Sequence, residues 1–285
     1  MILRSLALAG AAMLSGIAAA QPAPPANPPG SMQWLYGSAE GAAASIQAYD
    51  AFRDYVLARA RVRPRRSVVL AEGSTLEAPR FIPCGRRPRA VVLDVDETAL
   101  QNLGYEYDDA LHPGRSFDPA RWSRWERTGA NAVVAMPGAV EALGAIRRAG
   151  VTVIFNTNRG TDTAAGSAAA LNGAGIGPAV HGRTLWLQGD VAPGSGKDPR
   201  RAAISRRFCV IAMAGDQLGD FSDLFNARGL AVPERRRIAA SPPVARLWGN
   251  GWFVLSNPVY GTGLRGNLDD VFPAARRWSD PHGGK

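Results

Sequence analysis

Short apolar runs recur along the chain from residue 90 onward, separated by longer stretches in which apolar and polar residues are mixed. A continuous apolar run of this length is typical of a strand that is buried on both faces of a parallel sheet. We therefore predict buried strands at Ala90–Leu93, Val151–Phe155, Thr184–Leu187, Phe208–Met213 and Trp252–Leu255.

The stretches between these runs have helical periodicity. The clearest runs from Gly138 to Ala149, where Val140, Leu143 and Ile146 form one stripe and Gly150 follows as a cap. Alternating strands and helices predict an α/β fold, a doubly wound and mostly parallel sheet, whose functional residues gather at the carboxyl ends of strands.

A long amphipathic helix is predicted before the first strand, because apolar and small residues recur at helical spacing from about Ser38 to Ala60. The chain has 285 residues, of which 46% are hydrophobic, and this suits one domain with a modest insertion. We expect that domain to span residues 31–285, after a Pro-rich linker at 21–30.

The first 20 residues have the pattern of a cleavable secretory signal: Arg4, an apolar run, and Ala18-Ala19-Ala20 before Gln21. The apolar run is shorter than the 20 or so residues of a membrane span. We therefore expect an exported protein, periplasmic or secreted, that begins near Gln21. No cysteine follows the run to carry a lipid, so no stable membrane anchor is expected.

The formal charge of +9 attracts anions without identifying one. Basic runs such as Arg61–Arg66 lack interleaved aromatic residues, so no nucleic-acid polymer is expected as a partner. Cys84 and Cys209 are the two cysteines of the chain. Export favours a disulfide between them, but spacing does not distinguish it from two buried thiols.

Carboxylates follow two of the predicted strands. Asp94 and Asp96 come directly after the first, and Asp216 and Asp220 follow a later one. Crowded carboxylates are unfavourable unless a cation or a proton lies between them. An oxygen-rich site of this kind suits Mg²⁺, which binds few carboxylates together with water and substrate phosphate.

Groups suited to a phosphoryl oxyanion follow other strands. Residues 156–159 (Asn-Thr-Asn-Arg) offer a hydroxyl, amides and a guanidinium, and Lys197 and Arg200 lie near the next crossover. Any one of these is common as a helix cap or a turn residue. Their order at successive strand ends favours a catalytic site for phosphate esters.

In these features the chain resembles the haloacid-dehalogenase (HAD) superfamily and, within it, subfamily IIIB, the class C bacterial acid phosphatases, whose best-known members are outer-membrane lipoproteins. The resemblance covers most of the mature chain and rests on VLDVDETALQNLGY, Thr157-Asn158-Arg159, GDQLGDF and Ser256–Gly261. Asn156 departs from it, because an apolar residue usually precedes the threonine, and so does the missing lipid-bearing cysteine.

The resemblance implies roles for individual residues. Asp94 corresponds to the nucleophile and a metal ligand, and Asp96 to the general acid and base, with its backbone carbonyl on the metal. Asp216 corresponds to a direct ligand of Mg²⁺, and Asp220 orients it or a metal-bound water.

The phosphoryl group and the leaving group also have corresponding residues. Thr157 and Lys197 correspond to phosphate-binding residues, while Asn158 and Arg159 shape that pocket. The residues that line the leaving-group pocket would be Tyr105, Trp122 and Tyr260, and a small, mainly helical cap is expected at about residues 101–135.

The function expected from these features is Mg²⁺-dependent hydrolysis of small phosphomonoesters, nucleoside monophosphates among them, through an aspartyl phosphate. A phosphotransferase would use the same residues. A non-catalytic exported nucleotide- or haem-binding protein is the alternative from another class, but it has no chemical need of both Asp94 and Asp96. An oligomer is possible.

Overall fold

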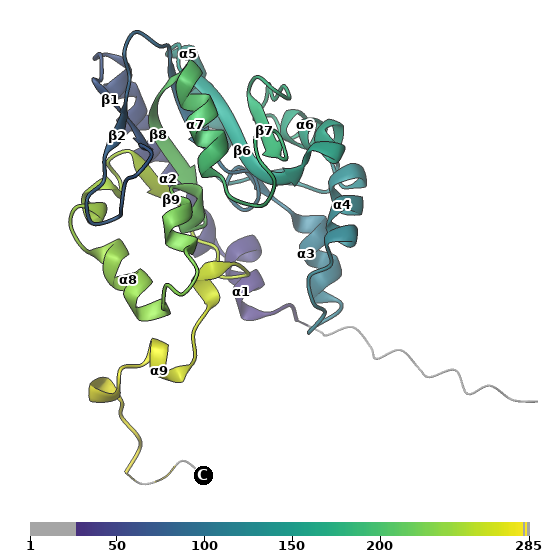
Figure 1. The fold of residues 1–285 in the computed structure, drawn as a ribbon. Coiled ribbons are helices and arrows are strands. Elements are labelled where there is room, and N and C mark those ends of the chain that lie inside the picture. Colours follow the sequence, from purple (N-terminus) through teal and green to yellow (C-terminus); the bar gives the residue numbers. More distant parts are fainter. Residues whose placement is uncertain (1–26, 282, 284–285) are drawn as a thin grey trace, which may run out of the picture.

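The computed structural model describes residues 27–281 and 283, and a parallel sheet of five strands in the order β7-β6-β3-β8-β9 lies at its centre (Figure 1). Every neighbouring pair in this sheet is parallel. The α/β fold predicted from the apolar runs is therefore confirmed. The strands of the central sheet are β3 (Arg89–Leu93), β6 (Thr152–Gly160), β7 (Leu185–Gln188), β8 (Cys209–Gly215) and β9 (Trp252–Val254).

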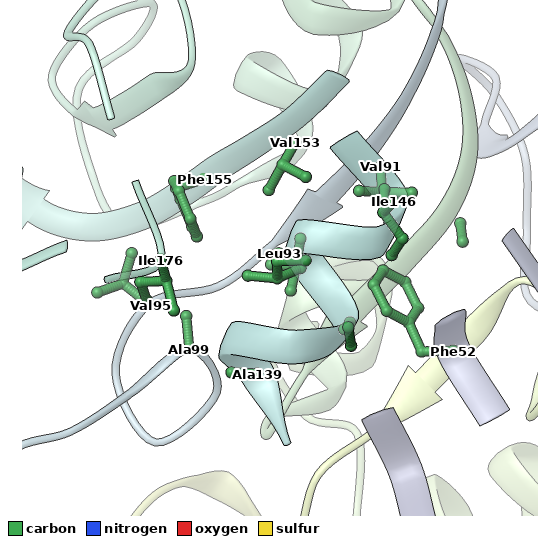
Figure 2. Close-up of a cluster of buried hydrophobic side chains, with 14 of the residues drawn as sticks. Phe52, Val91, Leu93, Val95, Ala99, Ala139, Ile146, Val153, Phe155 and Ile176 are labelled. Carbon is green, nitrogen blue, oxygen red and sulfur yellow. The ribbon is translucent and has the colours of Figure 1, made fainter. Parts of the chain in front are cut away.

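Helices cover both faces of the sheet. The α-helices of the described residues are α1 (Gly30–Met32), α2 (Ala39–Ala60), α3 (Leu103–Ala110), α4 (Pro119–Thr128), α5 (Ala139–Arg148), α6 (Ala164–Gly173), α7 (Asp198–Arg207), α8 (Val232–Ala240) and α9 (Leu268–Val271). Because successive side chains of a strand point to opposite faces, β3 contributes to two cores. Val91 and Leu93 pack with α2, α5 and α6, as Figure 2 shows for Phe52 and Ile146. The other two apolar side chains of β3 pack with α7 and α8.

The two helices that the sequence predicted most clearly form close to their expected bounds. Before α2, the hydroxyl of Ser38 accepts a hydrogen bond from the backbone NH of Gly41 at 2.9 Å, a typical N-cap. Gly138 and Gly150, which flank α5, have φ of 87° and 75°. That left-handed backbone suits glycine and ends the helix cleanly at both sides.

A small antiparallel hairpin, β1 (Arg66–Leu70) with β2 (Phe81–Pro83), was not predicted. Its strands are short, and β2 ends in a proline, which is a weak strand signal. The hairpin contacts β8 and α7. Val69 of β1 joins the core on that face of the sheet.

The chain between β3 and β6 forms an insertion beside the sheet. It begins at β4 (Leu100–Gln101) and ends at β5 (Val134–Ala135), which pair with each other in antiparallel register. Helices α3 and α4 lie between these strands, and α4 contacts α6 and β6 (Figure 1). We call residues 101–135 the cap.

A disulfide joins Cys84 to Cys209, with the two Cα atoms 4.7 Å apart. Cys209 is the first residue of β8, and its NH donates to the carbonyl of Pro88, just before β3, at 2.8 Å. The disulfide therefore lies at the amino ends of β3 and β8, and it answers the question that the sequence left open.

The amino-terminal residues 1–26 are not described, whereas the carboxy-terminal segment is described as far as residue 281. The predicted signal at 1–20 and most of the linker at 21–30 lie outside the described residues. Within the described part, none of the helices has the length and apolar character to cross a membrane. The segment after β9 leads to α9 and away from the body of the protein (Figure 1).

Candidate active site

Three carboxylates meet at the carboxyl ends of β3 and β8. These neighbouring strands are in register there, because the NH of Asp94 donates to the carbonyl of Ala214 at 3.0 Å. Asp216 follows β8 directly, and Asp220 ends the 3₁₀ turn Leu218–Asp220. One carboxylate oxygen from each of Asp94, Asp216 and Asp220 lies within 4.8 Å of the others. We call these three residues the acidic cluster.

Lys197 supplies the positive charge beside the acidic cluster. Its Nζ lies 2.6 Å from Asp94 Oδ1 and 2.7 Å from Asp220 Oδ1, and only 5% of the residue is exposed. Asp223 fixes the backbone at this point, because its two carboxylate oxygens accept from the NH groups of Lys197 and Asp198, both at 2.8 Å. The lysine at the start of α7 is thus held against the ends of β3 and β8.

The electrostatics of the acidic cluster are unfavourable without a cation. Burial, and then the charge of Asp220, raise the pKa of Asp94 well above its usual range against the opposing effect of Lys197. Burial and Asp220 also raise the pKa of Asp216 to about 7. Carboxylate oxygens with excess negative charge suit a hard divalent cation such as Mg²⁺. The donor set therefore fits the predicted metal.

Neighbouring polar groups orient Asp216. Its Oδ1 accepts from the hydroxyl of Thr98 at 3.0 Å, and its Oδ2 accepts from the side-chain amides of Gln217 at 2.9 Å and Asn257 at 2.8 Å. The sequence alone gave neither amide a role. Gly215 is needed next to them, since a Cβ there would lie 2.3 Å from that of Asp220.

Asp96 faces a different environment from the acidic cluster. The guanidinium of Arg159 donates to Asp96 Oδ1 at 2.7 Å, and the amide of Asn102 donates to the same oxygen at 2.9 Å. Arg159 also donates to Asn102 Oδ1 at 2.8 Å and is only 1% exposed. Arg159, which we expected to shape the phosphate pocket, thus lies behind Asp96 and holds its carboxylate.

Glu97 lies beneath this arrangement and was missed by the sequence reasoning. It is fully buried, its Oε1 accepts from the backbone NH of Asn102 at 2.9 Å, and its Oε2 accepts from the hydroxyl of Tyr260. Burial, and then the charge of Asp96, raise the pKa of Glu97 to about 7. Its φ of 49° is left-handed, and a sequence pattern does not show that such a turn directs the side chain inward.

Residues 156–159 form the last part of β6, whereas the sequence placed them after the strand. The hydroxyl of Thr157 lies 3.4 Å from Asp96 Oδ2, and Asn158 lines the cavity described below. Arg200, a candidate for direct phosphate contact, is 2% exposed and donates to the side-chain oxygens of Asn156 at 2.7 Å and Asn158 at 2.5 Å. It therefore positions the end of β6.

A cavity of about 1540 Å³ opens over these groups. It is lined by the acidic cluster, Asp96 and Lys197, and by the aromatic side chains of Tyr105, Trp122 and Tyr260. The first two come from the cap, and their rings meet edge to face with centroids 4.8 Å apart. The structure thus brings the three predicted pocket aromatics to the same cavity as the predicted nucleophile.

A doubly wound parallel sheet with aspartates after its two central strands, opposite a lysine and beneath a helical cap, defines an α/β enzyme of the haloacid-dehalogenase type. The chain belongs to the HAD superfamily, subfamily IIIB (Acid phosphatase), whose sequence model matches residues 46–263. It is an acid phosphatase, a phosphomonoesterase, as the resemblance predicted.

Solved structures show the same fold. The class C acid phosphatase from Bacillus anthracis superimposes with a TM-score of 0.64 at 24% identity, over 86% of this chain and 89% of that one. The same enzyme from Bacillus anthracis with tungstate bound gives a TM-score of 0.64 at 21% identity, over 85% of this chain and 92% of that one. No curated protein matches the chain.

Proposed function

We propose that this acid phosphatase is exported and Mg²⁺-dependent, and that it hydrolyses phosphomonoesters, including nucleoside monophosphates, through an aspartyl phosphate on Asp94. The position of Asp94 carries the proposal. Its carboxylate contacts Lys197 at 2.6 Å, belongs to the acidic cluster and lines the same cavity as Asp96. Asp94 as nucleophile, Asp96 as proton donor and Lys197 as cation are therefore all within reach of one bound phosphate ester.

Asp94, Asp216 and Asp220 would hold Mg²⁺, with the backbone carbonyl of Asp96 as a further ligand. When bound, the cation neutralises charge on the nucleophile and the phosphoryl group, which otherwise repel each other. The raised pKa values of Asp94 and Asp216 support this assignment, because burial and then the charge of Asp220 disfavour their charged forms, and a bound cation would offset both effects.

In the proposed reaction, Asp94 attacks phosphorus in line, so that a bond from its carboxylate oxygen forms as the bond to the leaving oxygen breaks. Asp96 donates its proton to that leaving oxygen, and it then takes a proton from the water that hydrolyses the aspartyl phosphate. Arg159 and Asn102 hold Asp96 in place for both transfers. Lys197 balances charge on the phosphoryl oxygens.

Nucleoside monophosphates are proposed as substrates because of the aromatic wall of the cavity. Tyr105, Trp122 and Tyr260 line it and offer ring faces and edges to a planar base. The hydroxyl of Tyr260 is fixed by Glu97, so its ring is held in one orientation.

Export is proposed from the signal-like residues 1–20 and is supported by the disulfide Cys84–Cys209, since disulfides persist in oxidising compartments. Fractionation of producing cells and amino-terminal sequencing test it. We expect the protein outside the cytoplasm with an amino terminus near Gln21. Full-length cytoplasmic protein would contradict export without affecting the enzymatic proposal.

The central experiment measures phosphate release from p-nitrophenyl phosphate and a panel of nucleotides at pH 5 to 7, with Mg²⁺ or with EDTA. We expect turnover with Mg²⁺ only, and its loss in Asp94→Asn. Asp54→Asn, an exposed carboxylate on α2, is the control and should retain activity. Turnover that survives EDTA or Asp94→Asn would refute the mechanism. Added alcohols would reveal phosphoryl transfer to an acceptor other than water.

A further inference from the structure

The cavity over the acidic cluster is larger than one phosphoryl group and a small leaving group require. Its volume of about 1540 Å³ exceeds the roughly 300–1,000 Å³ of most small-molecule sites. Part of its wall comes from the segment after β9, where residues 259–262 and Arg265 line the cavity. This wall is distinct from the acidic cluster and from the cap.

Arg265 differs from the other cationic side chains of the cavity because it has no acidic partner. Lys197 is paired with two carboxylates of the acidic cluster. Arg115 contacts two aspartates of the cap at 2.6 and 2.9 Å, and His112 lies 3.4 Å from Asp108. Arg265 is exposed, and within residues 27–281 it makes no ion pair. Its charge is thus available to a ligand.

A second guanidinium lies near Arg265. Arg235, on α8, is partly buried, and its guanidinium donates to the carbonyl of Phe225 and to the hydroxyl of Thr262, both at 3.0 Å. Burial and the positive charge of Arg265 lower the pKa of Arg235. Neither arginine has a carboxylate partner in the described part of the chain. Arg235 donates to Thr262, three residues before Arg265, so positive charge without a carboxylate partner gathers at this wall and favours a bound anion.

Hydrogen bonds connect Arg235 and Thr262, in the segment that carries Arg265, to Asp216 of the acidic cluster. The NH and hydroxyl of Thr262 donate to Gln217 Oε1 at 3.0 and 3.2 Å, and Gln217 Nε2 donates to Asp216 Oδ2 at 2.9 Å. Thr262 in turn accepts from Arg235 at 3.0 Å. The segment that carries Arg265 is therefore positioned relative to Asp216 by side chains, so the two ends of the cavity are kept in a defined relation.

We propose that Arg265, with the charge of Arg235 behind Thr262, forms a second anion subsite, and that it binds a second phosphate carried by the leaving group of the substrate. The preferred substrates would then be bisphosphorylated compounds such as nucleoside bisphosphates. One phosphate is hydrolysed at Asp94, and the other stays on the product. This inference rests on the proposed phosphatase mechanism and adds the substrate class.

The test compares kcat/KM for adenosine 3′,5′-bisphosphate and adenosine 5′-monophosphate at saturating Mg²⁺. We expect the bisphosphate to be favoured at least about tenfold, and Arg265→Gln to remove most of that preference. Arg265→Lys should keep part of it, because the charge remains while the bidentate geometry is lost. Arg276→Gln is the matched control, since Arg276 is also exposed and carboxy-terminal but does not line the cavity. An equal ratio in wild type and Arg265→Gln would overturn the subsite.

A binding measurement separates this inference from the catalytic proposal. Asp94→Asn and Asp94→Asn/Arg265→Gln are titrated with each nucleotide by calorimetry in the presence of Mg²⁺. We expect tighter binding of the bisphosphate to the first variant and equal binding of both nucleotides to the second. If the enzyme hydrolyses no nucleotide but this preference is present, the subsite stands and the proposed substrate chemistry fails. If both variants bind the two nucleotides equally, the subsite is refuted whatever the enzyme hydrolyses.

Discussion

The two ends of the central strand pair β3 and β8 are built on opposite principles. At the carboxyl ends, Asp94, Asp216 and Asp220 crowd like charges together in a buried place. At the amino ends, a disulfide joins Cys84 to Cys209, and Arg87 donates to the carbonyl of Cys84 at 2.9 Å. Both ends belong to the same two strands. The comparison shows that a strand pair can accommodate crowded like charges at one end when a disulfide and hydrogen bonds stabilise its other end.

Among variants that alter one end of this strand pair, the largest effect after Asp94→Asn is expected for Asp216→Asn, which should lower activity and raise the stability of the metal-free protein. Turnover at fixed Mg²⁺ should fall at least about 100-fold, because a metal ligand is lost. The metal-free variant should melt at a higher temperature than the wild type, because repulsion from Asp220 disappears. Thr98 can reverse its hydroxyl to accept from the new amide, so the hydrogen bond is retained.

Kinetics and thermal melts with and without Mg²⁺ check this prediction. Mg²⁺ at 100 times its dissociation constant should stabilise the folded wild type by about 2.7 kcal/mol. The melting temperature of the wild type should rise accordingly. It should leave the melting temperature of Asp216→Asn nearly unchanged. A metal-free variant that melts below the wild type would show that the acidic cluster is not a source of instability.

Removing the disulfide should lower stability and leave activity nearly unchanged, the opposite of the effect expected for Asp216→Asn. Cys84→Ser/Cys209→Ser opens a link between residues 125 apart in sequence, and it should lower the free energy of unfolding by about 2–5 kcal/mol. The kcat at 25 °C should stay within about twofold of the wild type, since the bond lies at the far ends of the strands. Denaturant melts and steady-state kinetics measure both. A parallel loss of kcat would mean that the two ends are not independent.

The pH dependence of stability tests the buried carboxyls around the site without mutating a residue of the acidic cluster. The pKa is raised to about 7 for Glu97 and to about 8 for Glu106, in both cases chiefly by burial. In the unfolded chain these groups titrate near 4.3. Between pH 4.3 and 7 the folded state therefore binds more protons, so stability falls as pH rises.

We expect the metal-free protein to lose up to about 1.4 kcal/mol per pH unit for each such carboxyl in this window. Unfolding in urea with EDTA, at pH 5, 6 and 7, measures the slope. Glu106→Gln should make it shallower, because one titrating group is removed. A stability that increases from pH 5 to 7 would contradict the raised pKa values.

The smallest effect is expected for Tyr260→Phe. The substitution keeps the ring on the cavity wall and removes the hydroxyl that donates to Glu97. Losing this internal hydrogen bond should cost about 1 kcal/mol of stability. The less firmly held ring should raise KM for nucleotides by less than about fivefold, with kcat little changed. p-Nitrophenyl phosphate serves as the comparison substrate. A fall in kcat alone would instead link Tyr260 to the proton transfers of Asp96.

Much of the fold followed from the sequence because the central strands are buried on both faces. Ala90–Leu93 and Phe208–Met213 are continuous apolar runs, and they became β3 and β8 with small changes in their bounds. The hairpin formed by Arg66–Leu70 and Phe81–Pro83 was missed because its strands are short and partly exposed. Apolar runs therefore locate central strands better than peripheral ones.

The carboxylates of the site were predictable to a similar extent. Asp94 and Asp216 follow adjacent strands, and strand ends alone bring them together. The residues that position these carboxylates were not predictable, because their contacts depend on the direction in which single side chains point. Glu97 turns inward through a left-handed backbone, and Gln217 links Asp216 to a segment more than forty residues later. Such contacts leave no periodic trace in the sequence.

The pairing of β4 with β5 brings the two ends of the cap together. Leu100 lies opposite Ala135 in the ribbon, so the cap leaves and rejoins the body at one place. A segment with such adjacent ends can be exchanged as a module, because grafting a different one leaves the β3 and β6 positions unchanged. The part of the cavity wall that Tyr105 and Trp122 form, and with it the leaving-group preference we propose, can therefore diversify independently of the acidic cluster.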